Sequence, residues 1–231
     1  MSARRVLVVA AHPDDEVLGC GATIAKYVRN GDEVHVLILA EGATSRDAER
    51  NREERGAELS ELAEAAHMAK DILGVTSLSL HDFPDNRMDS IDLLDIVKVI
   101  ECHIEKTRPE IILTHHTGDV NIDHRRIHEA VVTACRPTPS LSVHTLLFFE
   151  VSSSTEWQPP GSAPVFAPNW FEDISETVSL KLQALEAYHM EMRPWPHSRS
   201  VDAVNHLARW RGASVGVEAA EAFVLGRNLV R

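Results

Sequence analysis

The chain has 231 residues, of which 44% are hydrophobic, and a formal net charge of −12 at pH 7. This apolar content is sufficient for a folded core and excludes disorder as the default state, and the length suits one α/β domain over residues 1–231. The excess of acidic residues, with scattered arginines and no basic stripe, argues against a nucleic-acid partner and favours a neutral or metal-recruited small molecule as the substrate.

Cysteine usage and the N-terminal apolar run indicate where the protein works. Cys20, Cys102 and Cys135 lie far apart and form no Cys-x-x-Cys pair, which is typical of reduced thiols and not of a disulfide framework or a zinc ribbon. The apolar run at residues 6–11 is too short for a signal peptide or a membrane span. We therefore expect a cytoplasmic protein without a membrane partner, and the sequence leaves open whether its copies form a homo-oligomer.

The first predicted element is a buried strand at residues 6–11, Val-Leu-Val-Val-Ala-Ala. It lacks polar alternation, as is typical of a strand covered on both faces of a parallel sheet. The chain then changes abruptly to His-Pro-Asp-Asp-Glu at residues 12–16, where proline ends the strand and the acidic residues favour the first turn of a helix. In open α/β sheets, ligands bind at such a strand-to-helix junction.

The composition of this junction excludes one common kind of site and suggests another. A dinucleotide-binding strand is followed by a glycine-rich turn that accepts a pyrophosphate, whereas the carboxylates at residues 14–16 would repel it. An imidazole and carboxylates this close together can supply ligands to a divalent metal and leave one carboxylate for a water molecule. The alternative from spacing alone is an acidic helix N-terminus whose turn is capped by His12.

The rest of the chain alternates between strand and helix patterns. Apolar runs predict strands at residues 33–40, 75–80, 110–114, 145–150 and 220–229, and helical periodicity predicts helices at 17–30, 47–73, 90–107, 123 or 124 to 135, 172–191 and 201–211. Residues 152–171, rich in Ser and Pro, are predicted to be an ordered loop beside the site. The alternation predicts a three-layer, Rossmann-like α/β fold whose mostly parallel sheet has helices on both faces.

Residues Ala11–Glu16 resemble the signature of the LmbE-like, or PIG-L, family of zinc-dependent N-acetylglucosaminyl deacetylases. Asn121–His124 resembles the second block of that family, His-Pro-Asp-His, with the last two residues matching and the first two not. Farther along, residues 196–200, 211–212 and 220–223 resemble the C-terminal region of many members. The likeness therefore spans nearly the whole chain.

The resemblance implies a metal site and a reaction. It implies that zinc is bound by His12, Asp15 and His124, a set of three nitrogen and oxygen ligands that suits a catalytic zinc with an open position. Asp14 would be the general base and Asp123 would support a ligand imidazole or cap the helix. The expected reaction removes the acetyl group from an N-acetylated amino sugar or glycoside. Fe²⁺ accepts the same ligand types, so the metal is not decided.

A second metal hypothesis arises from His124 and His128, which share one helix face as in a His-Glu-x-x-His motif. Arg125 and Arg126 lie between them and no glutamate base is present. Pairing His124 with the first turn is favoured, because the crossover topology brings the ends of the two strands together. His128 is then predicted to have a structural role or to lie behind a ligand.

The departure from the family pattern lies at Asn121. Many members have a histidine there that stabilises the oxyanion or protonates the leaving amine, and a carboxamide has no titratable proton. Either Asp14 performs both proton transfers, or His116 or His197 enters the site from elsewhere. The sequence does not choose between these.

Two arginines are candidate substrate contacts. Arg46 follows the second predicted strand and so can reach the same edge of the sheet, with a solvated loop as the alternative. Arg87 and Asp85 lie in a segment whose family counterparts lie near the substrate, with a plain turn as the alternative. For the whole protein, the other hypotheses are a zinc amidase or esterase acting on a non-sugar acyl substrate, and a non-catalytic α/β binding module.

Overall fold

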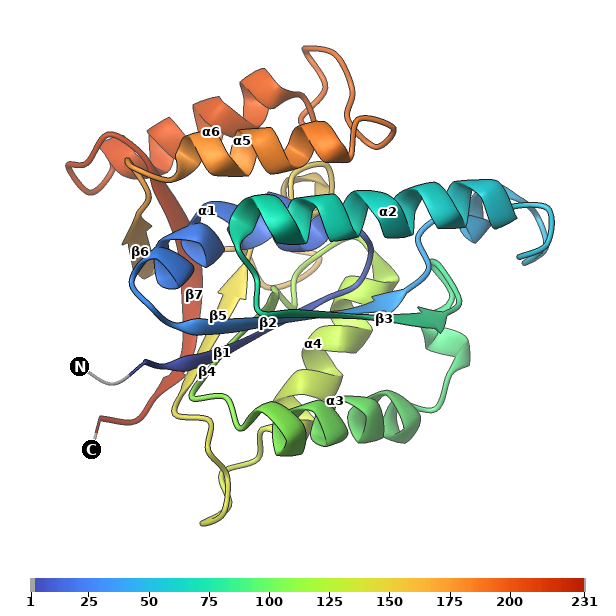
Figure 1. Cartoon of the computed structure of the whole chain (residues 1–231), viewed down its shortest axis with the longest axis horizontal. Helices are drawn as coiled ribbons and strands as arrows, with labels where there is room; N and C mark the ends of the chain where they lie inside the picture. Colours follow the sequence, from blue (N-terminus) through green and yellow to red (C-terminus); the bar gives the residue numbers. More distant parts are fainter. Residues whose placement is uncertain (1–2, 231) are drawn as a thin grey trace.

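The computed structural model describes residues 3–230, so residues 1, 2 and 231 of the predicted domain lie outside it. The described chain folds around a seven-stranded sheet with the order β3-β2-β1-β4-β5-β7-β6 (Figure 1). The strands are β1 (Arg5–Ala10), β2 (Glu33–Ala40), β3 (Ser77–Phe83), β4 (Ile111–His115), β5 (Thr145–Phe149), β6 (Trp170–Asp173) and β7 (Ala220–Asn228). Strands β1 to β5 pair in parallel, and β7 pairs antiparallel with both β5 and β6.

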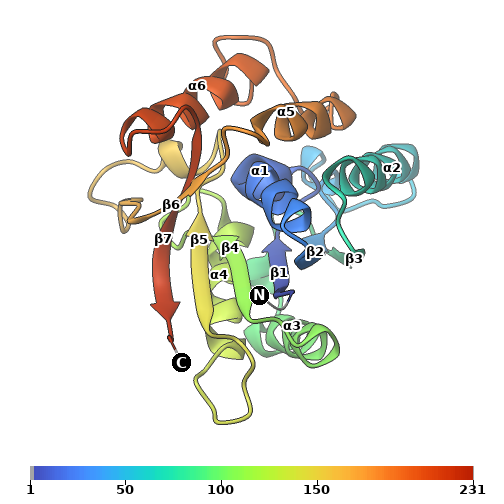
Figure 2. The same cartoon turned by 60° about the vertical axis from the view of Figure 1, so that its left-hand side comes forward.

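Helices cover both faces of this sheet. On one side lie α1 (Asp15–Arg29), α2 (Gly56–Leu73), α5 (Val178–Ala187) and α6 (Val201–Ala213), and on the other lie α3 (Leu93–Thr107) and α4 (Ile122–Ala134) (Figure 2). Val6 and Val8 of β1 belong to one core and Leu7 and Val9 to the other, which explains why this strand lacks polar alternation. The predicted three-layer, mostly parallel α/β fold is confirmed.

The helix predicted at residues 47–73 is wrong at its start, because α2 begins at Gly56. The charges ahead of it are used in tertiary contacts: Arg50 donates to the two carboxylate oxygens of Glu41 at 2.7 and 3.0 Å. Asn51 accepts hydrogen bonds from the backbone N–H groups two and three residues later, both at 3.2 Å. Such a local turn competes with helix formation.

The helix predicted at residues 172–191 is also too long. Residues Trp170–Asp173 form the edge strand β6 against β7, and α5 occupies only Val178–Ala187. Glu172 is held in the strand because its carboxylate accepts from Lys26 Nζ at 2.6 Å and from the Tyr27 hydroxyl at 2.8 Å. This partnership with α1 cannot be read from the apolar spacing of the segment.

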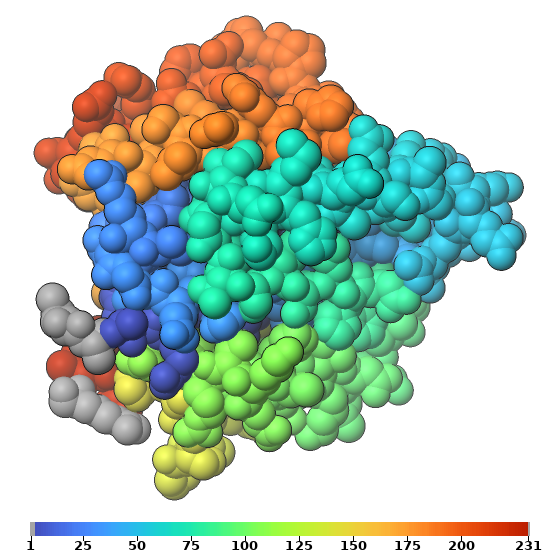
Figure 3. Space-filling model, in the orientation of Figure 1, coloured from blue at the N-terminus to red at the C-terminus, as the bar shows by residue number. Residues whose placement is uncertain are grey.

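The remaining elements lie within a few residues of their predicted bounds. The predicted loop at 152–171 contains a short 3-10 turn at Thr155–Trp157 and the start of β6. In the space-filling view the C-terminal segment lies against α2 (Figure 3), and α5 makes the contact with that helix. No helix within residues 3–230 is long and apolar enough to cross a bilayer.

The sheet order places a ligand-binding edge beside β1. This strand has β2 on one side and β4 on the other. The connection from β1 to β2 passes through α1 on one face of the sheet, whereas the connection from β3 to β4 passes through α3 on the other face. In open α/β sheets, this is the switch point at which ligands bind. The loops that follow β1, β2, β3 and β4 all contribute to one cavity there.

Candidate metal-binding active site

The turn after β1 has a strained backbone. Asp14 has a φ of 110°, which residues other than glycine rarely adopt. Asn86 and Ser153 also have positive φ and line the same cavity as Asp14, whereas the fourth such non-glycine residue in the described chain, Arg108, ends α3. Strain of this kind gathers at functional sites, so the backbone itself points to this cavity.

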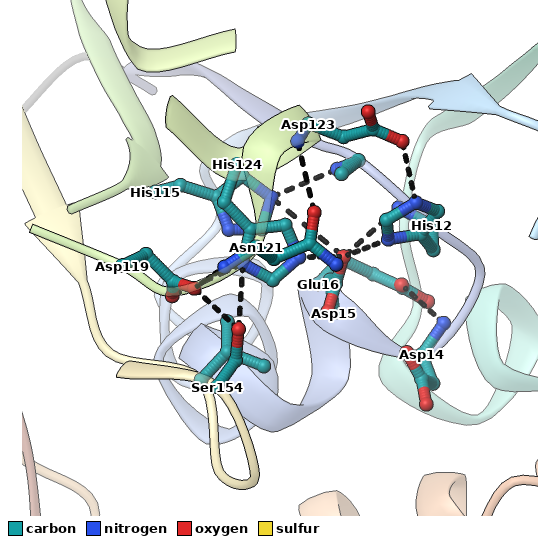
Figure 4. Close-up of polar contacts among 12 residues, drawn as sticks. His12, Asp14, Asp15, Glu16, His115, Asp119, Asn121, Asp123, His124 and Ser154 are labelled. Atoms are coloured by element: carbon teal, nitrogen blue, oxygen red, sulfur yellow. Dashed lines mark hydrogen bonds and ion pairs between the residues drawn. The ribbon is translucent and has the colours of Figure 1, made fainter. Parts of the chain in front are cut away.

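The predicted metal ligands meet at the carboxylate of Asp15. Its Oδ2 lies 3.2 Å from His12 Nδ1 and 3.1 Å from His124 Nε2 (Figure 4). One ligand atom from each of the three residues lies within 4.8 Å of the others. His12 follows β1 and His124 lies in the first turn of α4, so the crossover connection brings the two imidazoles together.

Groups on the far side of His124 orient its ring. Nδ1 lies 3.1 Å from Asp119 Oδ2, and Asp119 in turn accepts from the hydroxyls of Ser154 and Thr155. Nε2 is buried and makes no hydrogen bond to any group among residues 3–230, Asp15 included. A buried imidazole nitrogen that faces a carboxylate without a hydrogen bond suits a metal ligand, so these residues fit a divalent cation.

Two more carboxylates support the ring of His12. Its Nε2 lies 3.0 Å from Asp123 Oδ2 and 3.2 Å from Asp85 Oδ1, and these three residues form a second close group of ligand types. Asp123 also accepts from the backbone N–H groups of Asn86 and Met88 at 2.6 and 2.9 Å. Since Asp123 is already committed to these donors, we interpret it as the acceptor that turns Nδ1 of His12 towards Asp15.

The pKa values in this cluster favour positive charge on the imidazoles. Burial lowers the pKa of His12 and of His124, but the surrounding carboxylates outweigh it, so that the pKa of His12 is raised well above its usual value and that of His124 to about 9. Burial would raise the pKa of Asp15, yet the charge of His124 and the hydrogen bond with His12 hold it well below its usual value. A divalent cation can take the place of protons in such surroundings.

Asp14 differs from its neighbour Asp15 in its contacts. Its carboxylate points away from the imidazole cluster in Figure 4, and its Oδ2 lies 3.0 Å from Arg199 Nη1. Burial raises the pKa of Asp14 well above its usual value, while the charge of Arg199 acts in the opposite direction. Asp14 is therefore a buried carboxylate at the cavity that is not occupied in holding an imidazole.

A cavity of about 180 Å³ is lined by the carboxylates of Asp14 and Asp15. Of the predicted substrate contacts, Arg46 and Asn121 line it, and so do Asp85 and Asn86. The side-chain oxygen of Asn121 caps α4 by accepting from the Asp123 backbone N–H at 2.9 Å, and its amide donates to Asn86 Oδ1 at 3.0 Å. The cavity wall therefore offers several hydrogen-bonding groups of the kind that bind hydroxyls.

The structure does not bring Arg87, His116 or His197 to this cavity. Arg87 donates to a backbone carbonyl of the loop before α2 at 2.7 Å. The ring of His116 packs edge-on against Phe166, with centroids 5.3 Å apart, and that of His197 packs in the same way against Trp157 at 5.6 Å. Their positions thus give no support to the roles predicted for them.

The alternative metal pair His124 and His128 does not form. His128 Nδ1 donates to the backbone carbonyl of His115 at 2.9 Å, and its ring packs against Phe148 in β5. His128 belongs to neither group of ligand types found in residues 3–230. A structural role, as predicted for this case, agrees with these contacts.

Sequence reasoning missed Asp119, Ser154 and Arg199. Asp119 lies five residues before His124 in the same loop, so a search for a carboxylate near a predicted imidazole ligand would have found it. Arg199 lies in the proline-rich connector at residues 193–199, in which the sequence pointed only to His197. Ser154 lies in the segment predicted as a loop beside the site, but nothing distinguishes it from the neighbouring serines at 152 and 153.

Comparisons with known proteins identify the family of this chain. The family model described as GlcNAc-PI de-N-acetylase, PIG-L, matches residues 7–135, more than half of the chain. The uncharacterized deacetylase YaiS of Escherichia coli is 27% identical over 189 residues, which cover 79% of this chain and 89% of that protein. The diacetylchitobiose deacetylase of Thermococcus kodakarensis is 29% identical over 203 residues, which cover 81% and 70%. The conserved protein TT1542 of Thermus thermophilus has a TM-score of 0.74 at 25% identity over 98% of this chain and 96% of that one. The chain therefore belongs to the PIG-L family.

Proposed function

We propose that this protein is a metal-dependent deacetylase that removes the acetyl group from an N-acetylated amino sugar or glycoside of the N-acetylglucosamine type. The observation that carries the proposal is the buried Nε2 of His124, which makes no hydrogen bond among residues 3–230 and lies 3.1 Å from Asp15 Oδ2, in a group with His12 and beside a separate buried carboxylate, Asp14. Three ligands together with one further carboxylate that holds no imidazole is the arrangement of a catalytic metal site. The family relationship and the relatives named as deacetylases support the same reaction.

The proposed roles follow from the contacts of each residue. His12, Asp15 and His124 would hold the cation, which would polarise the acetamide carbonyl and acidify a water molecule. Asp14 would take the proton of that water during its attack on the carbonyl carbon. Asp119 and Asp123 would fix the two imidazole rings.

The cavity supports a sugar as the substrate. Its volume, about 180 Å³, is of the order needed for one small ring. Ser45, Asn86 and Asn121 line it with hydroxyl and carboxamide groups, which pair with the hydroxyls of a pyranose. A cytoplasmic location remains a prediction from the sequence.

Metal content and acetate release together test this proposal. The purified protein, loaded with Zn²⁺ or with Fe²⁺, is expected to release acetate from N-acetylglucosamine or diacetylchitobiose. Loss of activity after chelation and its return with one of the two ions would identify the working metal. A panel of non-sugar acetamides and acetate esters serves as the competing substrate class. If the metal-loaded protein turns over only members of that panel, its substrate is a non-sugar acyl compound. If the purified protein binds no stoichiometric metal, the hypothesis of a non-catalytic module is favoured.

The two adjacent carboxylates provide matched variants for the same assay. Asp14→Asn is expected to keep the metal and to lower kcat by roughly 10²-fold or more, the usual contribution of a general base. Asp15→Ala is expected to lower the metal content itself. Equal loss of metal in both variants would refute this division of roles.

A further inference from the structure

The residues that line the cavity indicate which group fixes the orientation of the proposed base, Asp14. His116 and His197 do not line the cavity, so neither is placed to supply a proton. Apart from the two histidines of the metal cluster, the cationic side chains among the described residues that line it are Arg46 and Arg199. The choice therefore lies between two arginines.

Their contacts distinguish these arginines. The Arg46 side chain is 38% exposed and pairs with Glu58 at 3.5 Å and with Glu191 at 2.5 Å. Its charge is therefore balanced by these two carboxylates at the rim of the cavity. The Arg199 side chain is 23% exposed and lies 3.0 Å from Asp14, whose side chain is only 3% exposed. Arg199 is therefore the cation in contact with the proposed base.

The guanidinium of Arg199 is fixed by more than one partner. Its Nε donates to Ser153 Oγ at 2.9 Å while its Nη1 engages Asp14 at 3.0 Å, and Glu191 Oε2 lies 3.6 Å away. Two different nitrogens with two different partners define the plane of the group, which a lysine ammonium cannot reproduce. A hydrogen bond joins the two ends of the connector, because the backbone N–H of Arg193 donates to the carbonyl of Arg199 at 3.2 Å.

We propose that Arg199 is a positioning residue that holds the carboxylate of Asp14 in the orientation needed for catalysis. This inference rests on the proposed deacetylase function. A guanidinium stays protonated at any working pH, so Arg199 does not act as the acid of the reaction. Its effect is exerted through Asp14.

The proton balance of the proposed reaction closes with one carboxylate. Water adds to the acetyl carbon and gives a proton to Asp14. The carbon–nitrogen bond breaks, and Asp14 returns that proton to the departing nitrogen, which leaves as the free amine. The acetic acid formed loses its own proton to solvent as acetate, and Asp14 is again a carboxylate for the next turnover.

The first test compares three variants of the metal-loaded protein. Arg199→Ala is expected to keep its metal and its KM within about twofold and to lose roughly 10- to 100-fold in kcat, because a base displaced by about 1 Å costs up to 10²-fold. Free guanidinium should restore part of the kcat of Arg199→Ala, and Arg199→Lys should fall between that variant and the wild type. The matched control is Arg193→Ala, since Arg193 lies in the same connector and its guanidinium donates to the backbone carbonyls of Met190 and Met192, away from Asp14.

Two kinetic results would overturn the inference. An unchanged kcat in Arg199→Ala would show that Asp14 needs no such support. A rise in KM with kcat unchanged would instead make Arg199 a substrate-binding residue.

A second test does not depend on turnover. Thermal unfolding of Asp14→Asn, Arg199→Ala and the double variant forms a cycle in which contacting residues give non-additive changes. Additive changes would overturn the pairing. If the wild type releases no acetate but the cycle is non-additive, the proposed function fails while the Asp14–Arg199 contact stands.

Discussion

At the residue scale, two adjacent carboxylates receive different surroundings from the same turn. Asp15 lies among imidazoles that outweigh its burial and lower its pKa, whereas burial dominates at Asp14 and raises its pKa. The positive φ of Asp14 directs its side chain away from that of Asp15. Two consecutive residues can therefore take different roles, one as a metal ligand and the other as a general base.

Asp119 provides a prediction at this scale, because its carboxylate faces Nδ1 of His124, on the side of the ring away from the proposed metal. Asp119→Ala should weaken the affinity for zinc roughly 10- to 100-fold, the usual effect of removing such a partner. Titration against a zinc-binding dye measures this, with the exposed Asp89→Ala as the control. An affinity equal to that of the control would mean that Asp119 does not orient His124.

Most of the site residues that the sequence predicted lie in two short segments, residues 12–16 and 121–124. His12, Asp14 and Asp15 form one turn, and their chemistry is visible in five consecutive residues. Arg199 lies 185 positions from Asp14, and only the folded chain brings the two together. Of the segment around Arg199 the sequence predicted only His197, which does not line the cavity.

At the element scale, α1 is broken just after the candidate site. Cys20 has non-helical backbone angles inside it. The freed N–H groups of Ala22 and Thr23 donate to Glu221 of β7 at 3.2 and 2.7 Å, and Lys181 of α5 donates to the carbonyl of Leu18 at 2.7 Å. Side chains of β7 and α5 therefore supply the hydrogen bonds that the backbone of α1 lacks at this break, and they fix the direction of its first turn.

The buried pair Lys181–Glu221 gives the prediction for this element. The two side chains are 5% and 4% exposed and lie 2.6 Å apart. Glu221→Gln should destabilise the protein by about 3–5 kcal/mol in urea unfolding, because a buried ammonium loses its partner. Adding Lys181→Met should recover a large part of the loss, and a double variant no more stable than the single one would contradict this account.

A surface pair provides the control for that measurement. Arg209 and Glu218 are 60% and 69% exposed and lie 3.3 Å apart. Glu218→Gln should change the stability by no more than about 0.5 kcal/mol, since exposed ion pairs contribute little. The comparison separates loss of a buried partner from loss of a negative charge.

The elements that the sequence predicted well are those with apolar runs buried in the sheet. The residues of β2 agree with the predicted 33–40 without a shift. The errors fall where charged side chains form pairs across the fold, as Arg50 does with Glu41 and Glu172 with Lys26. Periodicity counts such residues as a solvated helix face, because their partners lie in other segments.

At the scale of the whole molecule, the sheet order explains why distant segments form one site. The strands on either side of β1 lead their loops to the same edge, where the loop after β5 also contributes Ser153 and Ser154. The fold class was predictable because buried strands alternate with helices along the chain. The antiparallel β6 was not, since a four-residue edge strand carries too short a pattern.

Metal binding should stabilise the whole fold, because the proposed ligands come from two distant loops. Zn²⁺ at about 100 times its Kd should add about 2.7 kcal/mol of stability, which raises the Tm of a protein of this size by about 5–10 °C. Differential scanning fluorimetry with and without chelator measures the shift. Asp15→Ala should show little of it, and an equal shift in that variant would indicate that zinc binds elsewhere.

The most direct test of the account is the metal stoichiometry of two histidine variants. After dialysis against a low, buffered concentration of Zn²⁺, elemental analysis of the wild type and of His128→Ala should give about one equivalent of metal per chain. His12→Ala and His124→Ala should each give much less, since the account has both imidazoles on one cation. A full equivalent retained by either of these two variants would contradict it.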